Sequence, residues 1–146
     1  MSLQNAPDRR YLITFLRHGE SVGNANRLHQ GQADFPLTDT GRKQAQFLAR
    51  WWKDHNLQFD YAISSPLARA RETAEILGSA LGISILYDPI WMERNNGKLA
   101  GLSHAEAREE LPQPDYIPLH QPIADTGESL WELYLRAGQA LNNLFK

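Results

Sequence analysis

The chain has 146 residues, of which 42% are hydrophobic and 22% charged, with a formal net charge of −2 and no cysteine. This length suits one domain, and the composition excludes fibrous and disordered proteins. Without cysteine the chain has no disulfide, thiolate metal site or cysteine nucleophile, which fits a reducing compartment. Because lysines and arginines are scattered and no apolar run reaches the ~20 residues of a membrane span, we expect a cytoplasmic protein that binds neither nucleic acid nor a membrane.

The first third of the chain predicts a leader, a strand and a helix. Residues 1–10 are expected to form a disordered leader, and residues 11–146 a single domain. The apolar run over residues 11–16 is rich in β-formers and predicts a strand buried on both faces of a parallel sheet. Thr38 is a candidate N-cap for an amphipathic helix. The buried face of that helix is predicted to comprise Ala45, Leu48, Ala49 and Trp52.

The middle of the chain continues this alternation. Residues 61–64 predict a second strand, and Ser65 followed by Pro66 is typical of a helix start. That helix should end near Gly82, before a third strand over residues 83–87. Its buried face is predicted to comprise Ala70, Thr73, Ala74, Leu77 and Leu81. This alternation indicates an α/β fold with a mostly parallel sheet, right-handed crossovers and ligands at the carboxyl edge.

The second half is less regular. Residues 103–106 have the form of a capping box for a short helix, and the Pro-rich residues 111–122 predict an irregular loop. Asp125 and Glu128 are candidate caps for a last helix. Its apolar stripe is predicted to comprise Leu130, Leu133, Tyr134, Ala137, Leu141 and Leu144.

Two basic side chains directly follow the first predicted strand. Arg17 and His18 would therefore be held rigidly at the ligand-binding edge of the sheet, and Gly19 allows close approach of backbone. A neutral imidazole is a nucleophile at pH 7, and a guanidinium group forms paired hydrogen bonds to phosphate oxygens. Arg69 lies in the first turn of the next helix, where its charge adds to free N–H groups and the positive end of the helix dipole. These residues point to phosphate chemistry.

Four stretches of the sequence resemble the histidine phosphatase superfamily, which includes phosphoglycerate mutases and broad-specificity phosphatases. The similarity runs from about Tyr11 to the last predicted helix. It implies a three-layer, phosphoglycerate mutase-like α/β/α sandwich. The stretches are "RHGESVGNANRLHQGQADFPLTDTGRKQA", "SSPLARARETAE", "MERNNGKLAG" and "TGESLWELYLRA".

The resemblance also implies roles for individual residues. His18 matches the nucleophile that takes up a phosphoryl group, and water later hydrolyses the phosphohistidine. Arg17 and Arg69 match the phosphate clamps, and Glu93 matches the general acid that protonates the leaving oxygen. The family's loop that contributes polar contacts around the phosphate is matched by Asn24, Gln30 and Gly31. We expect scaffolding roles for Glu20, Trp51, Trp52, Ser129 and Trp131.

One expected element is missing from the sequence. Members of the family carry a second catalytic histidine in a His-Gly pair, after a strand that follows the last helix. The sequence reaches Lys146 without such a strand, and none of the four histidines other than His18 is followed by glycine. We therefore expect an incomplete domain that lacks the final strand and this histidine, and the loss of one such donor typically costs about 100- to 1,000-fold in rate. Because unpaired strand edges invite association, we also expect a homodimer or an exchange of segments between copies.

The resemblance leaves the reaction open between hydrolysis and isomerisation. Mutases of this kind carry a Tyr and a Lys where Asn96 and His104 stand, and two adjacent arginines in the following insertion. Residues 112–126 contain no arginine. We therefore favour a phosphatase that acts on a small phosphorylated metabolite without metal or cofactor. The alternatives are a phosphoglycerate mutase and a non-catalytic phosphate-binding module.

Overall fold

Two short parallel strands form the sheet. The computed structural model describes residues 11–145, so the expected leader over residues 1–10 lies outside the described part. Strand β1 (Ala62–Ser64) pairs in parallel with β2 (Ile85–Tyr87), with the first residue of one opposite the first residue of the other. These are the second and third predicted strands, and the predicted α/β fold is confirmed.

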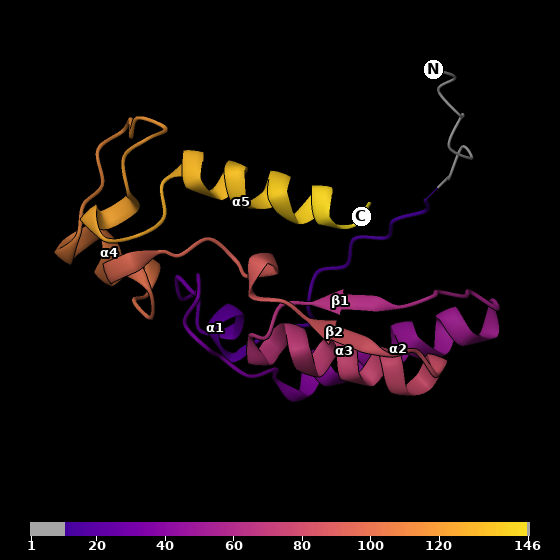
Figure 1. Ribbon diagram of the computed structural model, residues 1–146. Coiled ribbons are helices and arrows are strands. Elements are labelled where there is room, and N and C mark those ends of the chain that lie inside the picture. The colour runs from indigo at the N-terminus through magenta and orange to yellow at the C-terminus, as the bar shows by residue number, and fades with distance from the viewer. Residues whose placement is uncertain (1–10, 146) are drawn as a thin grey trace, which may run out of the picture.

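Helices α2 (Asp39–Asp54) and α3 (Ala68–Leu81) lie side by side on one side of the sheet (Figure 1). The predicted N-cap of α2 is confirmed, because the Thr38 hydroxyl accepts a hydrogen bond from the Gly41 N–H at 3.1 Å. The two helices pack through small and branched side chains, as their sequence periodicity predicts. Buried residues on them include Ala45, Ala49, Thr73 and Leu77.

The start of α3 differs from the prediction. The helix begins at Ala68, and Ser65 is not its N-cap but accepts a hydrogen bond from the N–H of Leu67 at 3.2 Å. The first helical N–H, that of Ala68, donates instead to the carboxylate of Asp34 at 2.6 Å. An anion is favourable at this position because it faces the positive end of the helix dipole. A side chain from a distant loop therefore caps the helix.

The predicted strand over residues 11–16 is wrong. This segment has no ladder hydrogen bonds in the part of the chain that the structure describes, and its apolar side chains face outward, with Leu12 96% and Phe15 68% exposed. It makes two aromatic contacts: Tyr11 lies 5.2 Å from Phe145 and Phe15 lies 6.4 Å from Trp91, between ring centroids. Among the described residues, β1 pairs only with β2. Within residues 11–145, the apolar run therefore pairs with no strand and its side chains stay exposed.

Short elements and loops make up most of the second half. The Pro-rich stretch 111–122 is irregular, as predicted, and α4 starts with the predicted capping box between Ser103 and Glu106. A small apolar cluster of Leu99, Ala107 and Ala124 holds these segments together. The short elements of this half are η1 (Pro89–Trp91), η2 (Gly97–Leu99), α4 (His104–Glu110) and η3 (Ile123–Asp125), and a further short helix, α1 (Val22–Ala25), lies in the first half.

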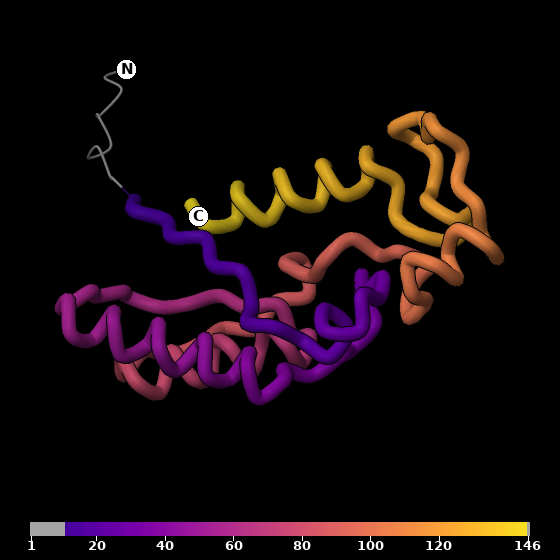
Figure 2. Tube along the Cα trace, turned by 180° about the vertical axis from the view of Figure 1, so that it is seen from behind, coloured from indigo at the N-terminus to yellow at the C-terminus, as the bar shows by residue number. Residues whose placement is uncertain are grey.

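The last helix, α5 (Leu130–Asn143), lies on the opposite side of the sheet from α2 and α3 (Figure 2). Its capping box is formed by Ser129 and Glu132, not by the predicted Asp125 and Glu128. Its predicted apolar stripe is largely uncovered, with Tyr134 61% exposed, because α5 packs mainly against η1. No helix within residues 11–145 is long and apolar enough to cross a membrane.

We predict that Thr38→Ala lowers the free energy of unfolding by about 1 kcal/mol, because the start of α2 loses its side-chain acceptor. Urea denaturation followed by circular dichroism measures this. Thr40→Ala, an exposed position in the same helical turn, is the control and should change the midpoint little. Equal losses in the two variants would contradict the capping role.

We also expect the 146-residue chain to self-associate through the exposed side chains of residues 11–16. Light scattering over a range of concentrations should then give a mass above 16.6 kDa, and Leu12→Lys combined with Phe15→Lys should lower it. Tyr116→Lys, at a 75% exposed position in the Pro-rich loop, is the control. A monomer at every concentration would contradict this expectation.

Candidate active site

The segment that carries His18 is fixed between two helices. The backbone of Gly19 lies so close to the first turn of α2 that a Cβ atom there would come within 2.5 Å of the Gly41 carbonyl oxygen, so only glycine fits. On the other side, the Gly19 N–H donates to the hydroxyl of Thr73 in α3 at 3.2 Å. That hydroxyl in turn donates to the Arg69 carbonyl at 2.7 Å. The contacts of Gly19 with α2 and α3 thus fix the position of His18.

Two contacts set the orientation and the tautomer of the His18 ring. Its Nδ1 lies 2.6 Å from the Gly19 carbonyl oxygen, and its Nε2 lies 3.2 Å from Nε of Arg69. A guanidinium group only donates hydrogen bonds, so Nε2 must accept and carries no proton. The proton is therefore on Nδ1, which donates it to the carbonyl oxygen. The lone pair on Nε2 is therefore unprotonated, and it accepts the hydrogen bond from Arg69.

The surroundings also keep this ring uncharged. Burial lowers the pKa of His18 below its ordinary value of 6.5, and the positive charges of Arg69 and Arg17 lower it further. The hydrogen bond to Gly19 and the charge of Glu93 raise the pKa, but they do not outweigh the other effects. At pH 7 the imidazole is therefore neutral, which is the state that a nucleophile requires.

Arg69 is almost completely buried, with 2% of its surface exposed. Two backbone carbonyl oxygens hold its guanidinium group: Nη1 donates to Ala33 at 3.0 Å and Nη2 to Gly31 at 2.7 Å. Burial lowers the pKa of Arg69, and the carboxylates of Glu93 and Asp34 oppose this effect. The group is a cation fixed by its partners, beside Nε2 of His18.

Arg17 and Glu93 lie at the exposed rim of the same site. The charge of each affects the pKa of both His18 and Arg69, which places the four predicted catalytic groups within electrostatic range of one another. The Glu93 carboxylate accepts a hydrogen bond from the Arg94 N–H at 2.8 Å. Arg17 and His18 also line an open depression together with Glu20, Asn24 and Gln44, whereas Arg69 and Glu93 are not among its lining residues.

The three residues expected around a phosphate differ in their placement. Asn24 lines the depression, although its side-chain oxygen also accepts a hydrogen bond from the N–H of Ser21 at the start of α1. Gln30 accepts from the hydroxyl of Ser21 at 2.6 Å and supports the loop. Gly31 has a φ of +51° in a tight turn and contributes its carbonyl to Arg69. The structure thus brings Asn24 to the depression and places Gln30 and Gly31 in its support.

Three of the other four histidines are engaged elsewhere. The rings of His29 and His104 lie 4.5 Å apart, and His55 stacks on Trp51 at 4.0 Å, measured between ring centroids. The His18 ring makes its contacts with Gly19 and Arg69.

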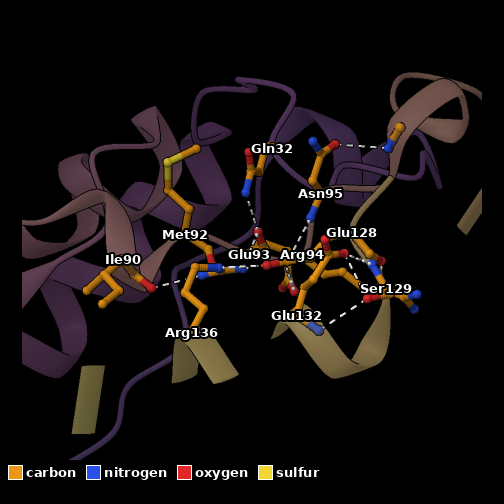
Figure 3. A network of polar contacts seen from close by, with 11 residues as sticks. Gln32, Ile90, Met92, Glu93, Arg94, Asn95, Glu128, Ser129, Glu132 and Arg136 are labelled. Atoms are coloured by element: carbon orange, nitrogen blue, oxygen red, sulfur yellow. Dashed lines mark hydrogen bonds and ion pairs between the residues drawn. The ribbon is translucent and has the colours of Figure 1, made fainter. Parts of the chain in front are cut away.

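Several supporting residues were not predicted as part of the site. Periodicity places Thr73 on the buried face of its helix but does not reveal what its hydroxyl bonds to. Asp34 caps α3 from a loop, and no sequence signal links the two. The pairing of Arg136 with Glu128, which holds the Glu93 segment (Figure 3), joins residues eight apart across a helix start. The sequence indicates Glu128 only as a candidate cap of the last helix.

The chain is similar to known proteins over most of its length. The chain matches the histidine phosphatase superfamily (branch 1) over residues 13–146. Probable phosphoglycerate mutase GpmB of Photorhabdus laumondii is 36% identical, in a match that covers 90% of this chain and 61% of that protein. Phosphoglycerate mutase-like protein 4 of Arabidopsis thaliana is 38% identical, in a match that covers 90% of this chain and 59% of that protein. The chain therefore spans about three fifths of the length of these relatives.

A solved structure has the same fold. The alpha-ribazole phosphatase from Shigella flexneri superposes with a TM-score of 0.78 at 27% sequence identity. The match covers 88% of this chain and 64% of that structure.

We predict that the His18 ring titrates below pH 6.5 with its proton on Nδ1, as measured by ¹⁵N NMR of the imidazole nitrogens. As the pH falls from 6.5 toward the folded pKa, the unfolded chain binds a proton before the folded chain does. His18 should therefore lower the free energy of unfolding over that interval and have no effect on its pH dependence above it.

Arg69→Met should raise the pKa of His18, because it removes a nearby positive charge. Arg71→Met, at an exposed position of the same helix, should leave that pKa unchanged. A His18 pKa at or above 6.5, or a proton on Nε2 of the neutral ring, would contradict the assignment.

Proposed function

Because this chain belongs to the histidine phosphatase superfamily, we propose that it hydrolyses the phosphate monoester of a small metabolite through a phosphohistidine formed at His18. The observation that carries the proposal is the unprotonated Nε2, 3.2 Å from the fixed cation of Arg69. A nucleophile for phosphorus needs a lone pair, and the phosphoryl group it attacks needs positive charge nearby. His18 supplies the lone pair, and Arg69 beside it supplies the positive charge.

In the first step, the Nε–H of Arg69 shifts its hydrogen bond from Nε2 of His18 to a phosphoryl oxygen of the bound monoester, and the freed lone pair on Nε2 attacks the phosphorus. As the N–P bond forms, the P–O bond to the leaving oxygen breaks. Glu93 gives a proton to that oxygen, so the product leaves as an alcohol. The imidazole becomes positively charged, and the Gly19 carbonyl stabilises it through the hydrogen bond from Nδ1.

In the second step, Glu93 acts as a base and takes a proton from water. The water oxygen attacks phosphorus and the P–N bond breaks. Inorganic phosphate and neutral His18 result, and Glu93 regains the proton that it lost. Arg69 and the exposed Arg17 stabilise the negative charge on the phosphoryl oxygens in both steps. The two reactions balance without a metal ion or a further cofactor.

A phosphoglycerate mutase is the second candidate, because relatives at 36% and 38% identity carry that name. A mutase returns the phosphoryl group to another hydroxyl of the substrate before water reacts. Incubation with a phosphoglycerate and a bisphosphorylated primer separates the two candidates: a mutase gives the isomer, and a phosphatase gives inorganic phosphate.

We predict that His18→Ala abolishes hydrolysis of p-nitrophenyl phosphate. Arg69→Met should lower kcat about 100- to 1,000-fold, since it removes a buried donor that faces the reacting group. His55→Ala, which alters a ring stacked on Trp51, is the control and should retain activity. Turnover by His18→Ala, or anion binding by the wild-type chain without phosphate release, would contradict the proposed function.

A further inference from the structure

Arg136 and Glu128 form an ion pair beside the segment that carries Glu93 (Figure 3). Nε of Arg136 donates to one carboxylate oxygen of Glu128 and Nη2 to the other, each at 2.7 Å. This is the two-bond geometry that makes arginine–carboxylate pairs strong and directional. The side chains are only 22% and 12% exposed, so solvent screens the pair weakly. The hydrogen bond lowers the pKa of Glu128 and raises that of Arg136, so both are charged at pH 7.

The remaining donors of Arg136 bind the backbone just before Glu93. Nη1 donates to the carbonyl oxygens of Ile90 at 2.8 Å and Met92 at 2.7 Å. Nη2 also reaches the Glu93 carbonyl at 3.5 Å. One side chain from α5 therefore binds three carbonyl groups at the start of this segment.

Glu128 binds the backbone just after Glu93. Its carboxylate accepts from the Asn95 N–H at 3.2 Å, and its own N–H donates to the Asn95 carbonyl at 2.8 Å. Its carbonyl oxygen accepts from Nε of Arg94 at 2.9 Å. The pair thus holds the segment on both sides of Glu93.

Glu93 itself is exposed, and its carboxylate accepts a hydrogen bond from the adjacent residue, Arg94. Its position is therefore set through its backbone rather than by packing around its side chain. Gln32 adds one bond, from its amide to the Glu93 carbonyl at 3.1 Å. A general acid must lie within hydrogen-bond reach of the leaving oxygen, and a misplacement of about 1 Å costs on the order of 100-fold in rate.

We propose that Arg136, aligned by Glu128, is a positioning residue that holds Glu93 where it can protonate the leaving oxygen. This inference rests on the proposed function, because it assumes that Glu93 is the acid. It assigns a role in the reaction to α5, a helix that contributes no residue to the depression beside His18. If the ion pair only stabilised the fold, its removal would lower the hydrolysis of every substrate by the same factor.

Two substrates distinguish positioning from stability. Glycerol 3-phosphate releases an alkoxide unless the leaving oxygen is protonated, so its hydrolysis needs the acid. p-Nitrophenyl phosphate releases a stabilised phenolate and needs the acid much less. Glu93→Gln should therefore lower kcat for glycerol 3-phosphate by about 100-fold or more, within the range for general acid catalysis, and lower it far less for p-nitrophenyl phosphate.

Arg136→Met should reproduce this selective loss in kcat, with KM for glycerol 3-phosphate little changed. Glu128→Gln keeps the shape of the partner but removes its charge, and it should give a smaller loss with the same selectivity. Arg71→Met removes the exposed pair with Glu75, which is 3.8 Å long, and it is the matched control that should affect neither substrate. Urea denaturation midpoints, measured for all variants, check that each variant is folded when its activity is compared with that of the wild type.

The outcomes separate the two proposals. If Glu93→Gln shows the selective loss but the Arg136 and Glu128 variants lower both substrates equally, or neither, the positioning role is wrong and the proposed function stands. If the wild-type chain hydrolyses neither substrate, or Glu93→Gln shows no selectivity, the acid assignment fails and the inference fails with it.

Discussion

The site depends on the contact between the guanidinium group of Arg69 and the imidazole ring of His18. This contact fixes which ring nitrogen carries the proton, because a cation that only donates must meet a nitrogen that accepts. It also keeps the ring uncharged, since burial and nearby positive charge act in the same direction on its pKa. The contact persists because carbonyl oxygens from the loop of Gly31 and Ala33 hold the guanidinium group from the other side.

Hydrogen bonds, more than apolar packing, assemble this site from distant segments. The His18 loop is bonded to α3 through Thr73, the start of α3 is capped by Asp34, and the Glu93 segment is held by Arg136. Among residues 11–145, no buried side-chain nitrogen or oxygen lacks a partner. A polar network that is fully satisfied is rigid, and a change at one member shifts its neighbours. The reactive groups therefore respond to residues that do not contact a substrate.

The sequence predicts local features of this fold better than distant ones. The helix behind Thr38, the capping box at Ser103 and the parallel pair of strands depend on neighbouring residues or on simple alternation, and all are present. Residues 11–16 look like a buried strand because their composition is right, but a strand also needs a partner, which composition cannot provide. The caps at Asp34 and Ser129 were missed for a related reason, since a cap depends on which oxygen the fold brings to the helix start. For the site, the resemblance identified the charged groups, whereas the bonds that orient them became visible only in three dimensions.

The most direct test is to determine which atom carries the phosphoryl group. The chain can be labelled with ¹⁵N-histidine, quenched during turnover under alkaline conditions that preserve phosphohistidine, and examined by ³¹P NMR. The account predicts phosphorus bonded to Nε2 of His18, and no such signal in His18→Ala. Phosphorus bonded to Nδ1, to another histidine or to an oxygen of the protein would contradict it.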